Sequence, residues 1–125
     1  MKKNTSIWLE QSSYDLETAN AMQRTGRYLY VAFMCQQAVE KQLKAMICGK
    51  TDKMPPYIHN LVRLSEHLNL DLNEKQMDHL DLLSSYYINS RYPVVKQKLA
   101  SSLDKEECER LLKNTKGIIE WLRKK

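Results

Sequence analysis

The sequence YLYVAFMCQQAVEKQLKAMIC, residues 28–48, sets the architecture of this chain. It runs for about six helical turns without a glycine or a proline, and the Gly49 that follows suits a left-handed residue at a helix C-terminus. At about 100° per residue, apolar side chains cover one broad face of this helix and recur on its far side. The broad face holds Leu29, Phe33, Val39, Leu43 and Ile47, and the far side holds Val31, Cys35, Ala38 and Ala45. A helix that is apolar around most of its circumference needs neighbours on several sides, so we expect it to be central.

Two polar residues fall inside the broad apolar face of this helix. Gln36 and Glu40 lie one turn apart, between Leu29 and Leu43. Removing one partner of a buried ion pair costs about 3–5 kcal/mol, so a buried Glu40 needs a cation beside it. Lys44 is the local candidate, because it follows Glu40 at i+4. An arginine from another segment is the stronger candidate, because a guanidinium binds a carboxylate through two parallel hydrogen bonds.

The segments before and after this helix also have helical patterns. A first helix is expected over residues 5–23, and the short connector at residues 25–27 makes the two helices antiparallel. The inner face of the first helix holds Trp8, Asp15, Ala19 and Met22. After a loop over residues 50–57, the pattern predicts a short helix from about His59 to Leu68.

The second half of the chain is divided by strong helix signals. Asn73 and Gln76 form a capping box that opens a fourth helix. Pro93 prevents this helix from continuing, so Arg91 is expected at or just beyond its frayed end. Residues 94–101 are expected to form a connector.

The last helix is expected to run from a second capping box to the C-terminus. Asp104 and Glu107 form this box. Gly117 lies inside the helix at a cost of about 1 kcal/mol relative to alanine, which predicts close helix packing at that point. The expected fold is all-α: residues 1–125 form a single domain, an antiparallel up-and-down bundle of four long helices plus one short helix.

Composition narrows the class of protein. The chain has 125 residues and a formal net charge of +5, which tolerates a polyanionic partner but describes an ordinary basic surface equally well. Three cysteines, an odd number, fit reduced thiols in a cytoplasmic protein. No apolar run approaches the length of a membrane span, and we expect no membrane association.

The motifs of common enzyme classes are missing from the sequence. The histidines and cysteines lack metal-ligand spacing, and neither a phosphate-binding glycine loop nor a serine nucleophile motif occurs. We therefore expect neither a metal nor another cofactor. What remains is a set of polar residues that could form a basic, partly aromatic pocket for a nucleobase and phosphate. Its members are Asp15, Gln37, Glu40, Lys41, Lys44, His59, Arg91 and Tyr92, and we expect the Arg91 guanidinium to neutralise Glu40.

Three segments of the chain resemble the HEPN domain family. They are QAVEKQLKA at residues 37–45, His59-Asn60-Leu61, and Ser90-Arg91-Tyr92-Pro93, preceded by the first-helix residues Trp8, Asp15, Leu16 and Ala19. The resemblance covers nearly the whole chain and implies a bundle that usually forms homodimers. It also implies association with nucleotides or RNA, often beside a minimal nucleotidyltransferase in a toxin–antitoxin pair.

The chain departs from the pattern of catalytic HEPN ribonucleases. These carry an arginine followed, after four to six intervening residues, by a histidine, whereas Arg91 is followed by YPVVKQK. Metal-free cleavage of RNA needs a proton acceptor and a proton donor, and a lysine of ordinary pKa is a poor base near neutral pH. The incomplete motif therefore predicts a non-catalytic module, and no catalytic residue is assigned.

Two other interpretations stay open. In one, His59 works with Arg91 as a metal-independent endoribonuclease. In the other, the charged residues form a buried ionic network that specifies the bundle and binds nothing. The apolar residues crowded at the end of the fourth helix, Tyr86, Tyr87, Ile88 and Tyr92, also predict a homodimer.

Overall fold

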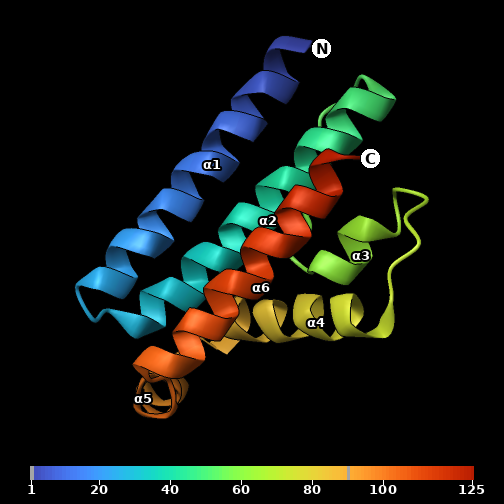
Figure 1. The fold of residues 1–125 in the computed structure, drawn as a ribbon. Coiled ribbons are helices and arrows are strands. Elements are labelled where there is room, and N and C mark those ends of the chain that lie inside the picture. The colour runs from blue at the N-terminus through green and yellow to red at the C-terminus, as the bar shows by residue number, and fades with distance from the viewer. Residues whose placement is uncertain (1, 90) are drawn as a thin grey trace.

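The computed structural model describes residues 2–89 and 91–125, and within them the chain is an all-α bundle, as expected (Figure 1). Six helices are present in these residues. They are α1 (Lys2–Arg24), α2 (Tyr28–Thr51), α3 (Leu61–Ser65), α4 (Glu74–Asn89), α5 (Pro93–Ser102) and α6 (Lys105–Arg123). Figure 1 shows α1, α2 and α6 running alongside one another, while α4 lies across them rather than along them. Ser90, the first residue of the Ser-Arg-Tyr-Pro segment, lies outside the described residues.

Helix α2 is central, as its apolar pattern predicts. It contacts each of the other five helices. Both of its apolar sides are buried: Val39 and Leu43 on one side and Val31 and Ala38 on the other have no exposed surface. The prediction that this helix ends at Gly49 is wrong. The helix continues to Thr51, and the left-handed residue is Asp52, which has a φ of 55°.

Helix α3 is shorter than predicted. It spans Leu61–Ser65 instead of His59–Leu68, because Asn60 caps its N-terminus by accepting a hydrogen bond from the Arg63 amide at 3.0 Å. His59 therefore lies on the loop before α3. The Leu61 amide donates to Ser84 Oγ on α4 at 3.0 Å, which fixes the start of α3 against α4.

The connector predicted at residues 94–101 is a helix, α5. Pro93 occupies its first turn, where a proline lacks no hydrogen bond that a helix would form. The same proline that ends one helix thus opens another. No periodic signal marks α5 in the sequence, because the helix buries none of its residues.

The predicted caps are present, but Gly117 behaves differently. Asn73 and Gln76 exchange both hydrogen bonds of a capping box, at 2.9 and 2.8 Å. Asp104 caps α6 by accepting from the Glu107 amide at 2.8 Å. A Cβ placed on Gly117 would meet no atom within 4 Å, so the close helix packing expected there is wrong.

The three cysteines lie inside the bundle. Cys35, Cys48 and Cys108 are free thiols, and all three are buried. None of the helices in the described residues is long and apolar enough to cross a membrane.

Candidate functional site

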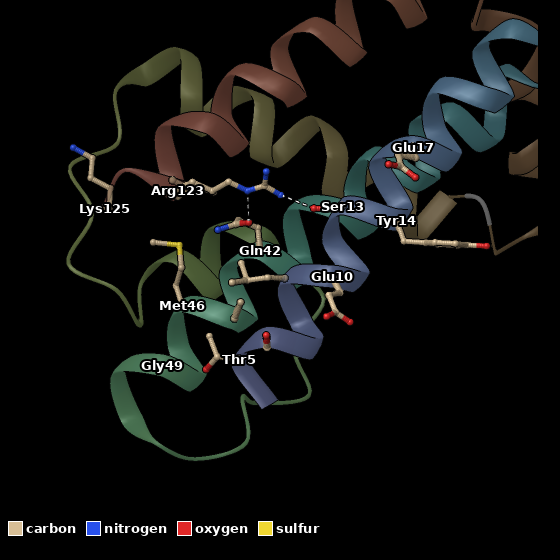
Figure 2. Close-up of a pocket in the computed structure, with 14 residues that line it drawn as sticks. Thr5, Glu10, Ser13, Tyr14, Glu17, Gln42, Met46, Gly49, Arg123 and Lys125 are labelled. Atoms are coloured by element: carbon tan, nitrogen blue, oxygen red, sulfur yellow. Dashed lines mark hydrogen bonds between the residues drawn. The ribbon is translucent and has the colours of Figure 1, made fainter. Parts of the chain in front are cut away.

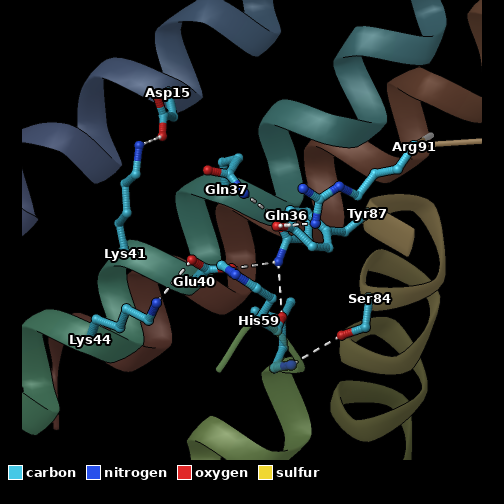
Figure 3. Close-up of polar contacts among 11 residues, drawn as sticks. Asp15, Gln36, Gln37, Glu40, Lys41, Lys44, His59, Ser84, Tyr87 and Arg91 are labelled. Carbon is cyan, nitrogen blue, oxygen red and sulfur yellow. Dashed lines mark hydrogen bonds and ion pairs between the residues drawn. The ribbon is translucent and has the colours of Figure 1, made fainter. Parts of the chain in front are cut away.

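Glu40 is the centre of a buried polar cluster on α2. The Glu40 side chain is 6% exposed, and its carboxylate accepts a hydrogen bond from Lys44 Nζ at 3.1 Å. Gln36 Nε2 donates to Glu40 Oε1 at 3.0 Å, and His59 Nδ1 lies 3.0 Å from the same oxygen (Figure 3). The local candidate, Lys44, is therefore the cation that pairs with Glu40.

A second ion pair joins α1 to α2. Lys41 Nζ lies 2.5 Å from Asp15 Oδ2, and the Asp15 side chain is 8% exposed (Figure 3). The helical phase correctly places Asp15 on the inner face of α1. Gln37 Nε2 donates to Gln36 Oε1 at 2.7 Å, which links Gln37 to the Glu40 cluster.

His59 connects the buried cluster to the surface. Its backbone oxygen accepts from Gln36 Nε2 at 3.1 Å, and its ring stacks on Tyr87 with the ring centroids 4.7 Å apart. The side chain nevertheless remains 47% exposed. A carboxylate at Nδ1 orients an imidazole and leaves Nε2 as the nitrogen that can exchange protons.

Arg91 does not neutralise Glu40, contrary to our expectation. It is exposed, its Nη1 donates to the Tyr87 hydroxyl at 3.1 Å, and its guanidinium carbon lies 5.2 Å from the centroid of that ring (Figure 3). The oxygens of Glu40 are already occupied by Lys44, His59 and Gln36, so a guanidinium is not needed there. Arg91 reaches the cluster indirectly, through the Tyr87 ring on which His59 stacks.

The aromatic partner of Arg91 is Tyr87 and not Tyr92. Tyr92 is the N-cap residue of α5 and is 61% exposed. Tyr87 stacks on Phe33 of α2, with a centroid distance of 5.8 Å and an interplanar angle of 12°. Tyr87, Phe33, Tyr30 and Arg91 line a hollow of about 230 Å³.

Three of the residues that line this hollow, Tyr30, Phe33 and Tyr87, were not predicted as site residues from the sequence, and neither was Lys96, which contacts Tyr30. Lys96 of α5 donates to the Tyr30 hydroxyl at 2.9 Å, and its ammonium lies 5.1 Å from the centre of that ring. Tyr30 and Phe33 are three residues apart on a helix, which places them on one side of α2. This spacing is the one signal in the sequence that Tyr30 and Phe33 share a surface, but it does not indicate that Tyr87 packs beside them.

Two larger cavities contain none of the predicted site residues. One, of about 690 Å³, lies between α1, α2 and the C-terminal end of α6, where Arg123 donates to both Gln42 and Ser13 (Figure 2). The other, of the same volume, lies between α4 and α6 beside His79. Within the described residues, no three or more His, Cys, Asp or Glu side chains gather where they could hold a metal ion.

The fold, together with the surface around Tyr30, Phe33, Tyr87, Arg91 and Lys96, defines a small all-α module with a cationic and aromatic face. The chain belongs to the HEPN family, because the HEPN domain model matches residues 5–125. In the general sense of that family, it is a nucleotide- or RNA-associated module.

The structure is also similar to a solved protein of the same size. The crystal structure of TT1696 from Thermus thermophilus has a TM-score of 0.82 and 25% sequence identity to this chain. The similarity covers 99% of this chain and 98% of that protein. Among curated proteins, no match to this chain was found.

Proposed function

We propose that this chain is a non-catalytic HEPN module that binds a nucleotide or RNA and acts with a minimal nucleotidyltransferase in a toxin–antitoxin type pair. The observation that carries the proposal is the exposed Arg91 guanidinium beside the hollow lined by Tyr30, Phe33 and Tyr87. Aromatic rings stack on bases of any sequence, and a guanidinium pairs with phosphate. The base and the phosphate of a nucleotide therefore both have a suitable partner on one surface.

The lack of catalysis is inferred from the residues around Arg91. No histidine follows it at the spacing of the catalytic family members, and Lys96 stands after four intervening residues. An ammonium already holds its full complement of protons at neutral pH, so it cannot accept one from a ribose hydroxyl.

Titration calorimetry tests the binding half of this proposal. ATP, GTP and a short single-stranded RNA are titrated into the wild-type protein and into Arg91→Ala. We expect binding of at least one ligand, weakened about tenfold or more in the variant, because a charge-assisted hydrogen bond is lost. Arg63→Ala is the matched control, since Arg63 is exposed and its side chain forms no ion pair with a described residue. If none of the three ligands binds, the proposal fails.

The proposed partner and dimer can be tested independently of the ligand. Ile88, Tyr92, Val94 and Val95 are between 40% and 70% exposed and lie at the corner between α4 and α5. This apolar patch supports a homodimer or a partner contact, whereas Tyr86 is buried and contributes nothing to it. Light scattering at micromolar concentration is expected to give twice the chain mass. Co-purification with the product of a neighbouring nucleotidyltransferase gene tests the partner.

The free, buried cysteines suit a reducing cytoplasm.

A second candidate function, a metal-independent endoribonuclease, is favoured by the geometry of His59. Glu40 orients the imidazole, and Tyr87 brings it to the same surface as Arg91. His59 Nε2 would take the proton of the ribose 2′-hydroxyl as that oxygen bonds to phosphorus, and Arg91 would stabilise the charge that develops on the phosphoryl oxygens. The bond from phosphorus to the 5′-oxygen would break, and this leaving oxygen would take its proton from water, because the site residues include no second histidine that could donate it. Incubation of tRNA with the protein in EDTA decides between the two functions. Cleavage lost in both His59→Ala and Arg91→Ala would establish the ribonuclease, and intact tRNA with wild-type protein would exclude it.

A further inference from the structure

Lys96 ties the exposed helix α5 to the central helix α2. Its ammonium donates to the Tyr30 hydroxyl at 2.9 Å and lies 5.1 Å from the centre of the ring. This hydrogen bond and the charge of Lys96 hold the pKa of Tyr30 below its usual value, with a smaller contribution from Arg27. Because Tyr30 lines the hollow, Lys96 brings a positive charge to one side of it.

Arg91 brings a second positive charge to the same hollow in a similar way. Its guanidinium donates to the Tyr87 hydroxyl, and Tyr87 also lines the hollow. Both cations are thus held by phenolic hydroxyls. In contrast, Lys41 and Lys44 are each paired with a carboxylate.

The charge of Arg91 and Lys96 is not neutralised locally. Neither forms an ion pair with a carboxylate anywhere in residues 2–89 and 91–125. Two unneutralised cations held near one aromatic hollow favour an anion there. A hydrogen bond to a neutral phenol is also readily exchanged for a stronger one to a charged oxygen.

The size of the hollow limits the aromatic part of the ligand. Its volume of about 230 Å³ is below the range of about 300–1,000 Å³ that drug-sized ligands occupy. It therefore suits one base rather than two. Tyr30, Phe33 and Tyr87 supply the rings against which that base would stack.

We propose that Lys96 and Arg91 form a phosphate-binding pair at this hollow, and that the ligand is one nucleotide carrying a terminal phosphate monoester. A monoester has a charge of about −1.5 to −2 at pH 7, which matches two cations, whereas an internal phosphodiester has one negative charge. This proposal rests on the proposed nucleotide binding and specifies its ligand. A free mononucleotide and the 5′-phosphorylated end of an RNA both provide this chemistry.

The test separates recognition of the base from recognition of the phosphate. AMP and adenosine are titrated into wild-type protein, Lys96→Met and Tyr30→Ala, with binding followed by NMR. We expect Lys96→Met to weaken AMP about tenfold or more and to change adenosine less than about twofold. Tyr30→Ala is expected to weaken both ligands, because it removes a stacking ring. Lys98→Met and Tyr14→Ala are the matched controls, since they make the same changes at exposed positions away from the hollow.

A second pair of probes identifies the source of the phosphate. A hexanucleotide RNA with a 5′-phosphate is compared with the same RNA ending in a 5′-hydroxyl. Tighter binding of the phosphorylated RNA than of AMP would identify an RNA end as the ligand, and the reverse order would identify a free nucleotide. Either order supports the proposal, provided that Lys96→Met removes the preference for phosphate.

Failure of this proposal is distinguishable from failure of the proposed function. If wild-type protein binds nucleotides but Lys96→Met and Lys98→Met behave alike, nucleotide binding stands and the phosphate pair is wrong. Equal affinity of the wild-type protein for AMP and adenosine would also overturn the pair. If no nucleotide or RNA binds at all, both proposals fail together. Thermal melting of each variant shows whether a loss of binding reflects a loss of fold.

Discussion

Replacing Glu40 with glutamine tests the buried cluster most directly. The substitution keeps the size and one acceptor oxygen but leaves Lys44, which is 5% exposed, without its carboxylate. Breaking a buried pair on one side costs about 3–5 kcal/mol of unfolding free energy. Because the amide oxygen can still accept one hydrogen bond, we expect Glu40→Gln to cost about 3 kcal/mol, the lower end of that range.

The magnitude can be measured by urea unfolding followed by circular dichroism. The free energy of unfolding is extrapolated linearly to zero urea for wild type, Glu40→Gln and a surface control. The control is Glu107→Gln, because the pair of Glu107 with Arg110 is largely exposed and such pairs contribute about 0–1 kcal/mol. The double variant Glu40→Gln/Lys44→Met removes both charges and should recover most of the loss.

Two results would refute the reasoning about Glu40. One is a cost for Glu40→Gln no greater than that of the surface control, which would mean that water reaches the cluster. The other is a double variant as unstable as the single one, which would mean that the unpaired Lys44 is not the source of the cost.

Three further predictions concern single side chains. Arg91→Ala should change the free energy of unfolding by less than about 0.5 kcal/mol, since Arg91 is exposed; a large drop in melting temperature would restore the interpretation of a purely structural ionic network. Gly117→Ala should stabilise the chain by about 1 kcal/mol in the same urea assay, because its Cβ meets open space. No gain would contradict this reading of the space around Gly117. Burial lowers the pKa of His79 from 6.5, so the unfolded chain binds a proton at this histidine more readily than the folded chain does. The contribution of His79 to stability is therefore complete above pH 6.5 and is lost as the pH falls through its lowered pKa. In a plot of urea midpoint against pH, His79→Asn should flatten this acidic part of the curve.

The helical phase of the sequence was sufficient to orient two acidic residues. It placed Asp15 and Glu40 on inner faces, and both are buried. It was not sufficient to predict which distant side chain meets them. The guanidinium expected at Glu40 lies on Tyr87, and the loop residue His59 takes that place. Periodicity reports the orientation of a residue on its own helix, whereas pairing depends on how helices and loops pack.

Helix α5 shows a second limit of periodicity. A helix that buries no residue has no apolar stripe, so the usual signal is missing. Its one local signal, Pro93, is ambiguous because a proline both ends a preceding helix and suits the first turn of the next. Since Lys96 lies on α5, treating residues 94–101 as a connector also hid its contact with Tyr30.

One series of contacts connects the buried polar cluster to the proposed binding surface. Lys44 and Gln36 hold Glu40, Glu40 orients His59, and the His59 ring stacks on Tyr87. Tyr87 in turn holds Arg91 at the surface. We therefore expect stability to depend on the buried end of this series of contacts and the proposed ligand recognition to depend on its exposed end. It follows that a change at Glu40 would affect binding through the position of His59, whereas a change at Arg91 would affect binding and leave the fold intact.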